Sequence, residues 1–197
     1  NLDMCSAQPW NLAKDAKLRE AIARDVDGKG LVVPWFPAVV DGVPAYWGCL
    51  NNPVYQENVR QRVRDAAAAG CKGLHVDCAN MTAGNILCSY GGCYCPSCME
   101  AVKKYVRNKY SRQQLSDMGI NDLDAWDFVT EVKRVAGTAQ ELPKVIASGR
   151  LEQQVPLFRD FRSFVAQSNR VWLEELATLT KQLGGRDAGY SVNAMSI

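Results

Sequence analysis

The sequence predicts an α/β fold in which parallel strands alternate with helices, and two observations lead to this prediction. First, the short β-branched stretch Leu31–Val33 is followed by a helical segment over residues 52–70 and then by the apolar stretch 73–78, GLHVDC. A strand, a helix and a second strand form a βαβ crossover, whose two strands run parallel. Second, further helical segments separate this stretch from another apolar stretch at residues 190–195.

The segment over residues 52–70 has helix signals at both ends. Asn52 is a favourable N-cap residue, and Pro53 suits the first helical position. Gly70 favours the end of the helix, because glycine readily adopts the left-handed conformation that closes many helices. Apolar residues between these ends recur at helical spacing, at Tyr55, Val59, Val63, Ala66 and Ala67.

The stretch 73–78 alternates between polar and apolar side chains, as a strand does. Residues two apart share a face, so His75 and Asp77 lie on one face of the strand. The other face carries Leu74, Val76 and Cys78. Asp77 ends the strand where parallel α/β folds place ligand-handling residues, which makes it the candidate catalytic residue. The alternatives are a structural carboxylate for Asp77 and a core position for His75, the sole histidine.

More helices and a last strand are expected after the cysteine-rich stretch. Ser97 and Glu100 have the spacing of a capping box, and Ser111 and Gln114 repeat it. We also expect helices over 121–134 and 157–183 and a strand over 190–195. A complete (β/α)8 barrel has about 250 residues, and at least about 200, so 197 residues with three or four visible strands would form only a partial barrel.

Length and composition are those of a globular domain. Of the 197 residues, 47% are hydrophobic and 22% are charged, and we expect a single domain over residues 1–197. A formal net charge of +2 gives no electrostatic reason to expect nucleic acid or an anionic membrane as a partner. No apolar run approaches the roughly 20 residues of a membrane span. Because the chain begins at Asn1, it is either a piece of a longer protein or a mature product, and an oligomer is compatible with it.

Three of the eight cysteines lie close together, as Cys93-x-Cys95-x-x-Cys98. Thiols at this spacing can converge on one metal ion, and tetrahedral zinc takes four nitrogen or sulfur ligands, so Cys88 or Cys49 would supply the fourth. A closed four-sulfur site is structural rather than catalytic. The alternatives are reduced thiols without a metal, or a disulfide of Cys88. Clustered cysteines in a chain of this length also favour a reducing compartment, the cytoplasm, over a disulfide framework.

Aromatic and amide side chains are candidate contacts to a carbohydrate. The loop at residues 34–48 is rich in proline and glycine and contains several aromatic residues, which either stack on a sugar or cover the core. Asparagine side chains near the strand ends can donate and accept hydrogen bonds. The candidate substrate-binding residues are Trp10, Trp47, His75, Asn80 and Asn193.

Residues 92–115, GCYCPSCMEAVKKYVRNKYSRQQL, resemble the zinc-containing β-galactosidases of glycoside hydrolase family 42, in which a Cys-Tyr-Cys-x-x-Cys knuckle runs into a helix. Residues 48–63, GCLNNPVYQENVRQRV, resemble the family's cysteine-containing segment before the strand that bears its acid/base residue. Residues 7–29 resemble a Pro-Pro-x-Trp-Leu stretch that ends in Asp-x-Asp-Gly. The family's next helix and strand resemble residues 155–179 and 191–195.

This resemblance covers most of the chain in the family's order. It implies a (β/α)8 barrel of the clan A glycoside hydrolases, of which the chain holds a part, and a carbohydrate substrate of the β-galactoside type. It also implies a structural zinc ion, which makes Cys49 rather than Cys88 the fourth ligand. The implied ligand set is Cys49, Cys93, Cys95 and Cys98.

The chain departs from the family at the catalytic position. The family's strand ends in Asp-Asn-Glu, whose Glu is the general acid/base, whereas here Asp77 is followed by Cys and Ala. Retaining hydrolysis uses two carboxyl groups about 5 Å apart, and the sequence places neither Asp3, Asp25 nor Glu57 beside Asp77. We therefore expect a glycoside hydrolase-like protein whose catalytic machinery is incomplete in this chain. The alternative is a non-catalytic module, derived from a hydrolase, that binds carbohydrate or is only stabilised by zinc.

Overall fold

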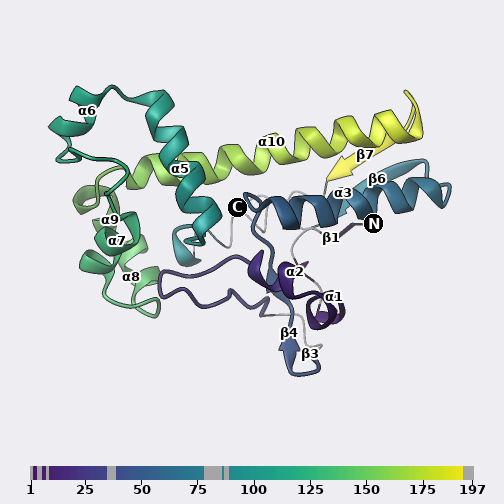
Figure 1. The fold of residues 1–197 in the computed structure, drawn as a ribbon, viewed down its shortest axis with the longest axis horizontal. Coiled ribbons are helices and arrows are strands. Elements are labelled where there is room, and N and C mark those ends of the chain that lie inside the picture. Colours follow the sequence, from purple (N-terminus) through teal and green to yellow (C-terminus); the bar gives the residue numbers. More distant parts are fainter. Residues whose placement is uncertain are drawn as a thin grey trace.

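The computed structural model describes residues 2–3, 6–7, 9–34, 39–77, 86 and 89–192, and it describes their side chains except those of 2, 3, 6, 7, 9, 10 and 77. The molecule is elongated, and the long helix α10 (Phe158–Gly184) runs along much of its length (Figure 1). At one end α10 lies beside a group of short helices, and at the other it lies beside a small parallel sheet (Figure 1). Within the described ranges, no helix is both long and apolar enough to cross a membrane.

The parallel sheet has three strands in the order β1–β6–β7. They are β1 (Leu2–Asp3), β6 (Gly73–Asp77) and β7 (Gly189–Val192). The central strand, β6, pairs with both neighbours, so that Asp77 is the register partner of Asp3, and His75 is that of Ser191. Strands were predicted at both 73–78 and 190–195, and both are present in the part of each stretch that the structure describes. A complete barrel stays a prediction, because this sheet is the one parallel sheet among the described residues.

The stretch Leu31–Val33 is not the parallel partner of β6, contrary to the prediction. The backbone N–H of Leu31 donates to the carbonyl of Ala23 at 2.9 Å, and that of Val33 donates to Ala45 at 3.0 Å. Bridges in this region are antiparallel. A β-branched stretch specifies extended backbone, but its partner is chosen by tertiary packing, and here the parallel partner is the much earlier strand β1.

The residues around this stretch form a small antiparallel layer. Strand β2 (Ser6–Ala7) pairs with β5 (Tyr46–Trp47), and β3 (Val39–Val40) pairs with β4 (Val43–Pro44). The turn between β3 and β4 is Asp41-Gly42, with φ values of 51° and 76°. Positive φ at both central residues is what a two-residue type I′ hairpin turn requires. Two short helices, α1 (Pro9–Lys14) and α2 (Ala16–Glu20), lie between β2 and β3 in the sequence.

Helices α3 (Pro53–Ala68) and α10 both pack against the same face of the sheet. Leu74 and Val76 of β6 are buried in a core to which the two helices contribute Tyr55, Val59, Val63, Trp172 and Leu176. His75, between them in the sequence, is exposed. The predicted alternation is therefore confirmed over residues 74–76. The predicted start of α3 is also confirmed, because the Asn52 side chain accepts a hydrogen bond from the Val54 N–H at 2.9 Å.

The helical end of the molecule is built on a second core. Its helices are α5 (Pro96–Lys109), α6 (Arg112–Asp117), α7 (Phe128–Ala136), α8 (Leu142–Ala147) and α9 (Arg150–Gln154). Aromatic rings fill the centre of this core, with the ring centroids of Phe128 and Phe161 4.7 Å apart and those of Tyr94 and Phe161 5.5 Å apart. At the rim, Lys109 forms an ion pair with Asp160 at 2.5 Å, which joins the end of α5 to the first turn of α10.

Two of the predicted helix starts are wrong, whereas those of α6 and α10 are confirmed, the latter to within one residue. Helix α5 begins at Pro96 with Cys95 as N-cap residue, so Ser97 lies inside the helix and forms no capping box with Glu100. The helix expected from residue 121 begins at Phe128, because the Asp127 side chain accepts from the backbone N–H groups that open it. The capping box at the start of α6 is present, with both of its hydrogen bonds, between Ser111 and Gln114.

We predict that Gly48→Ala destabilises the protein for steric reasons alone. A Cβ atom at this position would lie 2.0 Å from the ring of Tyr55, which is 1% exposed and cannot swing into solvent. Overpacking of this kind costs roughly 1–3 kcal/mol of unfolding free energy, measured by urea denaturation.

Gly189→Ala is the matched control for Gly48→Ala. Neither glycine has a positive φ, and a Cβ at Gly189 meets no atom within 4 Å. The control should stay within about 0.5 kcal/mol of the natural protein. Equal effects of the two substitutions would show that the contact with Tyr55 is not tight.

Candidate functional site

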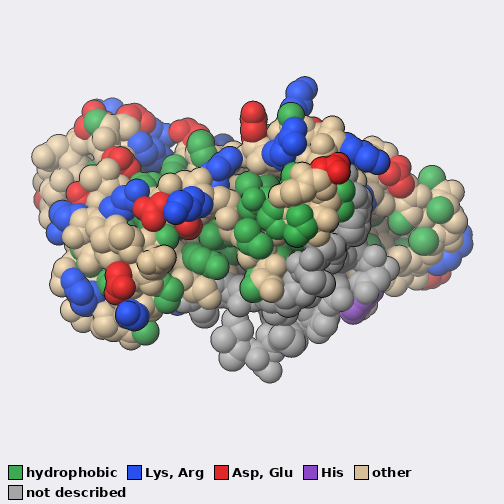
Figure 2. Space-filling view, turned by 90° about the horizontal axis from the view of Figure 1, so that it is seen from below, with side chains coloured by type: hydrophobic (Ala, Val, Ile, Leu, Met, Phe, Trp, Pro, Cys, Tyr) green, Lys and Arg blue, Asp and Glu red, His purple; other side chains and the backbone are tan. Residues whose placement is uncertain are grey.

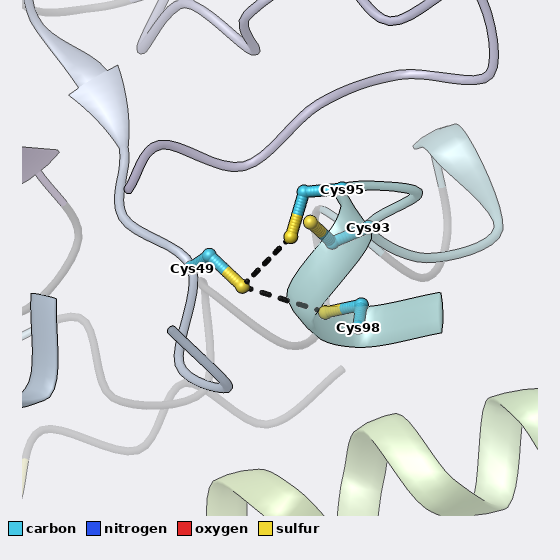
Figure 3. A group of neighbouring side chains, drawn as sticks. All are labelled: Cys49, Cys93, Cys95 and Cys98. Carbon is cyan, nitrogen blue, oxygen red and sulfur yellow. Dashed lines mark hydrogen bonds between the residues drawn. The ribbon is translucent and has the colours of Figure 1, made fainter. Parts of the chain in front are cut away.

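Four cysteine side chains from two separate segments meet in the core. Each sulfur atom of Cys49, Cys93, Cys95 and Cys98 lies within 4.8 Å of the others, and all four residues are buried. The sulfur of Cys49 lies 3.3 Å from that of Cys95 and 3.4 Å from that of Cys98 (Figure 3). All four are free thiols in the structure. Cys49 thus belongs to the cluster, and Cys88, the other candidate, lies outside the described residues.

Backbone hydrogen bonds from one further segment hold the two cysteine-bearing segments together. The N–H of Cys49 donates to the carbonyl of Ala21 at 3.0 Å. Three residues later, the N–H of Arg24 donates to the sulfur of Cys93 at 3.4 Å, and the carbonyl of Arg24 accepts from the Tyr94 N–H at 2.9 Å. Residues 21–24 therefore contact both cysteine-bearing segments through their backbone N–H and carbonyl groups.

The turn before Cys93 requires its two glycines. Gly91 and Gly92 have φ values of 70° and 149°, which other residues rarely adopt. A Cβ at Gly92 would lie 2.2 Å from the ring of Phe161. The turn therefore lies directly against the aromatic core, and this contact fixes the position of the cysteines that follow.

The electrostatics of the cluster favour one thiolate at a time. Hydrogen bonds from the neighbouring thiols, that of Cys49 above all, lower the pKa of Cys95. The same sulfur–sulfur contacts and burial raise the pKa of Cys98, and those with Cys93 and Cys95 raise the pKa of Cys49. Several thiolates in one buried volume would repel each other, and a bound cation removes this repulsion.

The donor set fits a tetrahedral metal ion. Zinc–sulfur bonds of about 2.3 Å place tetrahedral sulfur ligands about 3.8 Å apart, and the four sulfur atoms here already lie within 4.8 Å of one another. Cys95 and Cys98 also sit at the start of α5, where the helix dipole favours negative charge. The side-chain amide of Asn51 donates to the sulfur of Cys98 at 3.3 Å. Four sulfur ligands leave no open position, so a metal held here would be structural.

A second candidate site lies at the carboxyl end of the parallel sheet. Asp77 is the last residue of β6, and its register partner on β1 is Asp3. The sequence carries the same signal twice, since each aspartate directly follows an apolar strand residue, Leu2 or Val76. Sequence reasoning could not pair them, because register between strands more than 70 residues apart is set by tertiary structure. The two acidic residues therefore occupy neighbouring positions at one edge of the sheet.

His75 lies two residues before Asp77 and is on the surface. Its Nδ1 atom lies 2.8 Å from the Oγ atom of Ser191 on β7, so the two side chains share a hydrogen bond across the sheet. The His75 side chain is exposed. His75 is therefore accessible and is not a core residue.

Within the part of the chain that the structure describes, the other predicted substrate-binding residues do not come together. Trp47 is 1% exposed and packs in the core beside the cysteines, which favours the core interpretation of this ring. Trp10 belongs to α1, but its ring is outside the description, as are Asn80 and Asn193 entirely.

The remaining acidic candidates have structural roles. The carboxylate of Asp25 accepts from the backbone N–H groups of Asp27 and Lys29, both at 2.9 Å. Glu57 lies on α3 and forms ion pairs with Arg60 and Arg64. Neither lies at the edge of the parallel sheet.

Comparison with known proteins finds distant similarity to two alpha-agarases. One, from Alteromonas agarilytica, is 24% identical over 144 residues, which are 73% of this chain and 10% of that protein. Another, from Thalassotalea agarivorans, is 25% identical over 138 residues, which are 70% of this chain and 9% of that protein. The chain thus spans about a tenth of the length of the curated relatives that it matches. No family model and no solved structure matches the chain.

This similarity supports a relation to proteins of the glycoside hydrolase kind, and no finer relation. The resemblance to the β-galactosidases of family 42 gains no support from these comparisons, because no relative of that family and no model of it is found.

Proposed function

We propose that this chain is part of a carbohydrate-active enzyme of the glycoside hydrolase kind, with a galactose-containing polysaccharide such as agarose as its substrate. The observation that carries the proposal is the similarity to two alpha-agarases, over 73% and 70% of the chain. The resemblance to β-galactosidases concerns sugars of the same type, but nothing favours a β-linkage over an α-linkage. We therefore propose no particular anomer.

The order of the strands supports the proposal that the fold is part of a (β/α)8 barrel. β1, β6 and β7 are neighbours in chain order, and both α3 and α10 pack on one face of the sheet. Right-handed crossovers that all proceed in one direction leave their helices on a single face, as in a barrel, whereas a doubly wound sheet reverses and is covered on both faces. In such a barrel, the carboxyl edge with Asp77 would be the edge at which the active site lies.

The register pair at this edge supplies the two acidic residues that the proposed reaction needs. Asp3 and Asp77 are register partners on neighbouring strands, which lie about 4.8 Å apart, and retaining hydrolysis uses two carboxyl groups. In retaining glycosidases one carboxyl group protonates the leaving oxygen while the other acts as the nucleophile. We assign this pair of tasks to Asp3 and Asp77, with His75 positioned to contact a sugar hydroxyl.

We also propose that the four cysteines hold a structural zinc ion. The donor set is all sulfur, buried and close to tetrahedral spacing, which suits zinc and excludes a hard cation that prefers oxygen ligands. When bound, zinc supplies positive charge that lets all four thiols ionise. The four cysteines then link the loop before α3 to the start of α5.

We predict one zinc ion per chain in protein purified under reducing conditions without a chelator, measured by elemental analysis. Cys95→Ser should lower the zinc content and the melting temperature together, because binding energy at a site of this type is also folding energy. Cys71→Ser is the matched control, because Cys71 is a free, exposed thiol far from the cluster, and it should change neither quantity. Protein without zinc, or a disulfide between any two of the four cysteines, would contradict the proposal.

We predict that Asp77→Asn and Asp3→Asn each lower the rate of agarose hydrolysis by at least a hundredfold, because general acid catalysis alone contributes about 10²–10⁴. The rate is measured as reducing ends released by the natural protein that contains this chain. Asp187→Asn is the matched control, as an exposed aspartate near the start of β7, and should keep full activity.

Full activity of both Asp3→Asn and Asp77→Asn would remove the sheet edge from the mechanism. If the natural protein releases no reducing ends from agarose or from aryl galactosides of either anomer, the non-catalytic carbohydrate-binding module becomes the better description of the chain.

A further inference from the structure

A hollow of about 290 Å³ lies where α3, α5 and α10 meet. Figure 1 shows α5 crossing α10 beside the start of α3. The volume is at the lower end of the range of roughly 300–1,000 Å³ that small-molecule sites occupy. None of its lining residues belongs to the parallel sheet or is one of the four cysteines, although the lining residue Asn51 donates a hydrogen bond to Cys98.

The floor of this groove is aromatic. The rings of Tyr105 and Phe164 pack against each other with centroids 5.7 Å apart, and Tyr105 is only partly buried. Trp172 also lines the groove, is 2% exposed, and its Nε1–H group has no acceptor among the described residues. Such a floor offers apolar surface to a ligand, while the Trp172 Nε1–H group itself is buried.

The rim is polar, and three of its side chains are unpaired. Lys104 and Asn108 are one turn apart on α5 and share a face, and Gln167 faces them from α10. All three are exposed, and within the described part of the chain none of their side chains forms a hydrogen bond or an ion pair. They are therefore free to bind a ligand without breaking an existing contact.

The charge of the groove points to a neutral ligand. Glu175, its one acidic lining residue, is paired with Arg60 on α3 at 2.6 Å between Oε1 and Nε. Lys104 is then the remaining charge that lines it. A phosphate or carboxylate ligand is normally held by several cationic groups or by a bidentate arginine, and the groove offers one ammonium group instead.

We propose that this groove binds one sugar unit of a neutral polysaccharide, at a distance from the sheet edge. A sugar presents hydroxyl groups that both donate and accept, which the side-chain amides of Asn108 and Gln167 match, and C–H faces that pack on aromatic rings. This inference rests on the proposed function for the choice of polysaccharide, agarose. A second contact to the same polymer keeps it close to the catalytic edge and raises its effective concentration there.

The test is titration of the 197-residue, metal-loaded chain with agarose oligosaccharides, followed by NMR or calorimetry. The variant Lys104→Ala with Gln167→Ala should weaken binding at least tenfold. Its matched control is Lys181→Ala with Gln153→Ala, an exposed lysine and an exposed glutamine outside the groove, which should bind like the natural chain. Thermal melts of both variants verify that they fold.

Two results would overturn the proposal: no binding by the natural chain, or equal affinity of the groove variant and its control. Turnover of a small aryl galactoside by the natural protein reports on the sheet edge alone, and the groove variant should leave it unchanged. Loss of that turnover in the groove variant would show that the groove is part of the catalytic site, which also overturns the proposal. Oligosaccharide binding tests the groove and aryl galactoside turnover tests the proposed hydrolase function, so the two proposals can fail independently.

Discussion

Four sulfur atoms that must share one small buried volume constrain the path of the chain more than any other contact. Cys49 and Cys98 are 49 residues apart, yet their sulfur atoms lie 3.4 Å apart. Three features bring them together. Backbone groups of residues 21–24 form hydrogen bonds with both cysteine-bearing segments. The Gly91–Gly92 turn packs against Phe161, and Cys95 and Cys98 lie at the start of α5. Contacts within the chain therefore fix the loop before α3 relative to the start of α5.

Helix α10 contributes side chains to the cores at both ends of the molecule. Its first half contributes Phe158, Phe161 and Phe164 to the aromatic core, and its second half contributes Trp172 and Leu176 to the core beneath the sheet. A helix of 27 residues is about 40 Å long, so a single rigid element belongs to both cores. On the face shown in Figure 2, charged side chains of both signs are interspersed over the helical end of the molecule. This distribution agrees with the formal net charge of +2.

Local signals in the sequence were enough for part of the local structure, although they placed the starts of α5 and α7 wrongly. The cap and first residue of α3, the alternation at residues 74–76 and the capping box of α6 each depend on side chains within a few positions of one another. The position of Cys49 in the cluster followed from a family resemblance and not from spacing, which left Cys88 equally suitable. Features that depend on distant segments were not predictable. The pairing of Asp3 with Asp77, the antiparallel partners of Leu31 and Val33, and the groove between α5 and α10 all arise from contacts that no pattern in one window contains.

Asn51 connects the cysteine cluster to the groove. Its side-chain amide donates a hydrogen bond to the sulfur of Cys98, and Asn51 also lines the groove between the helices. If the proposed ion and the proposed sugar both bind, a shift of Asn51 couples the two sites. Thermodynamic linkage makes the effect reciprocal, so that a sugar held in the groove must retain the ion more tightly by the same factor by which the ion strengthens sugar binding. A site that looks purely architectural would then act as an effector site, and an abundant polysaccharide would protect the protein against chelation.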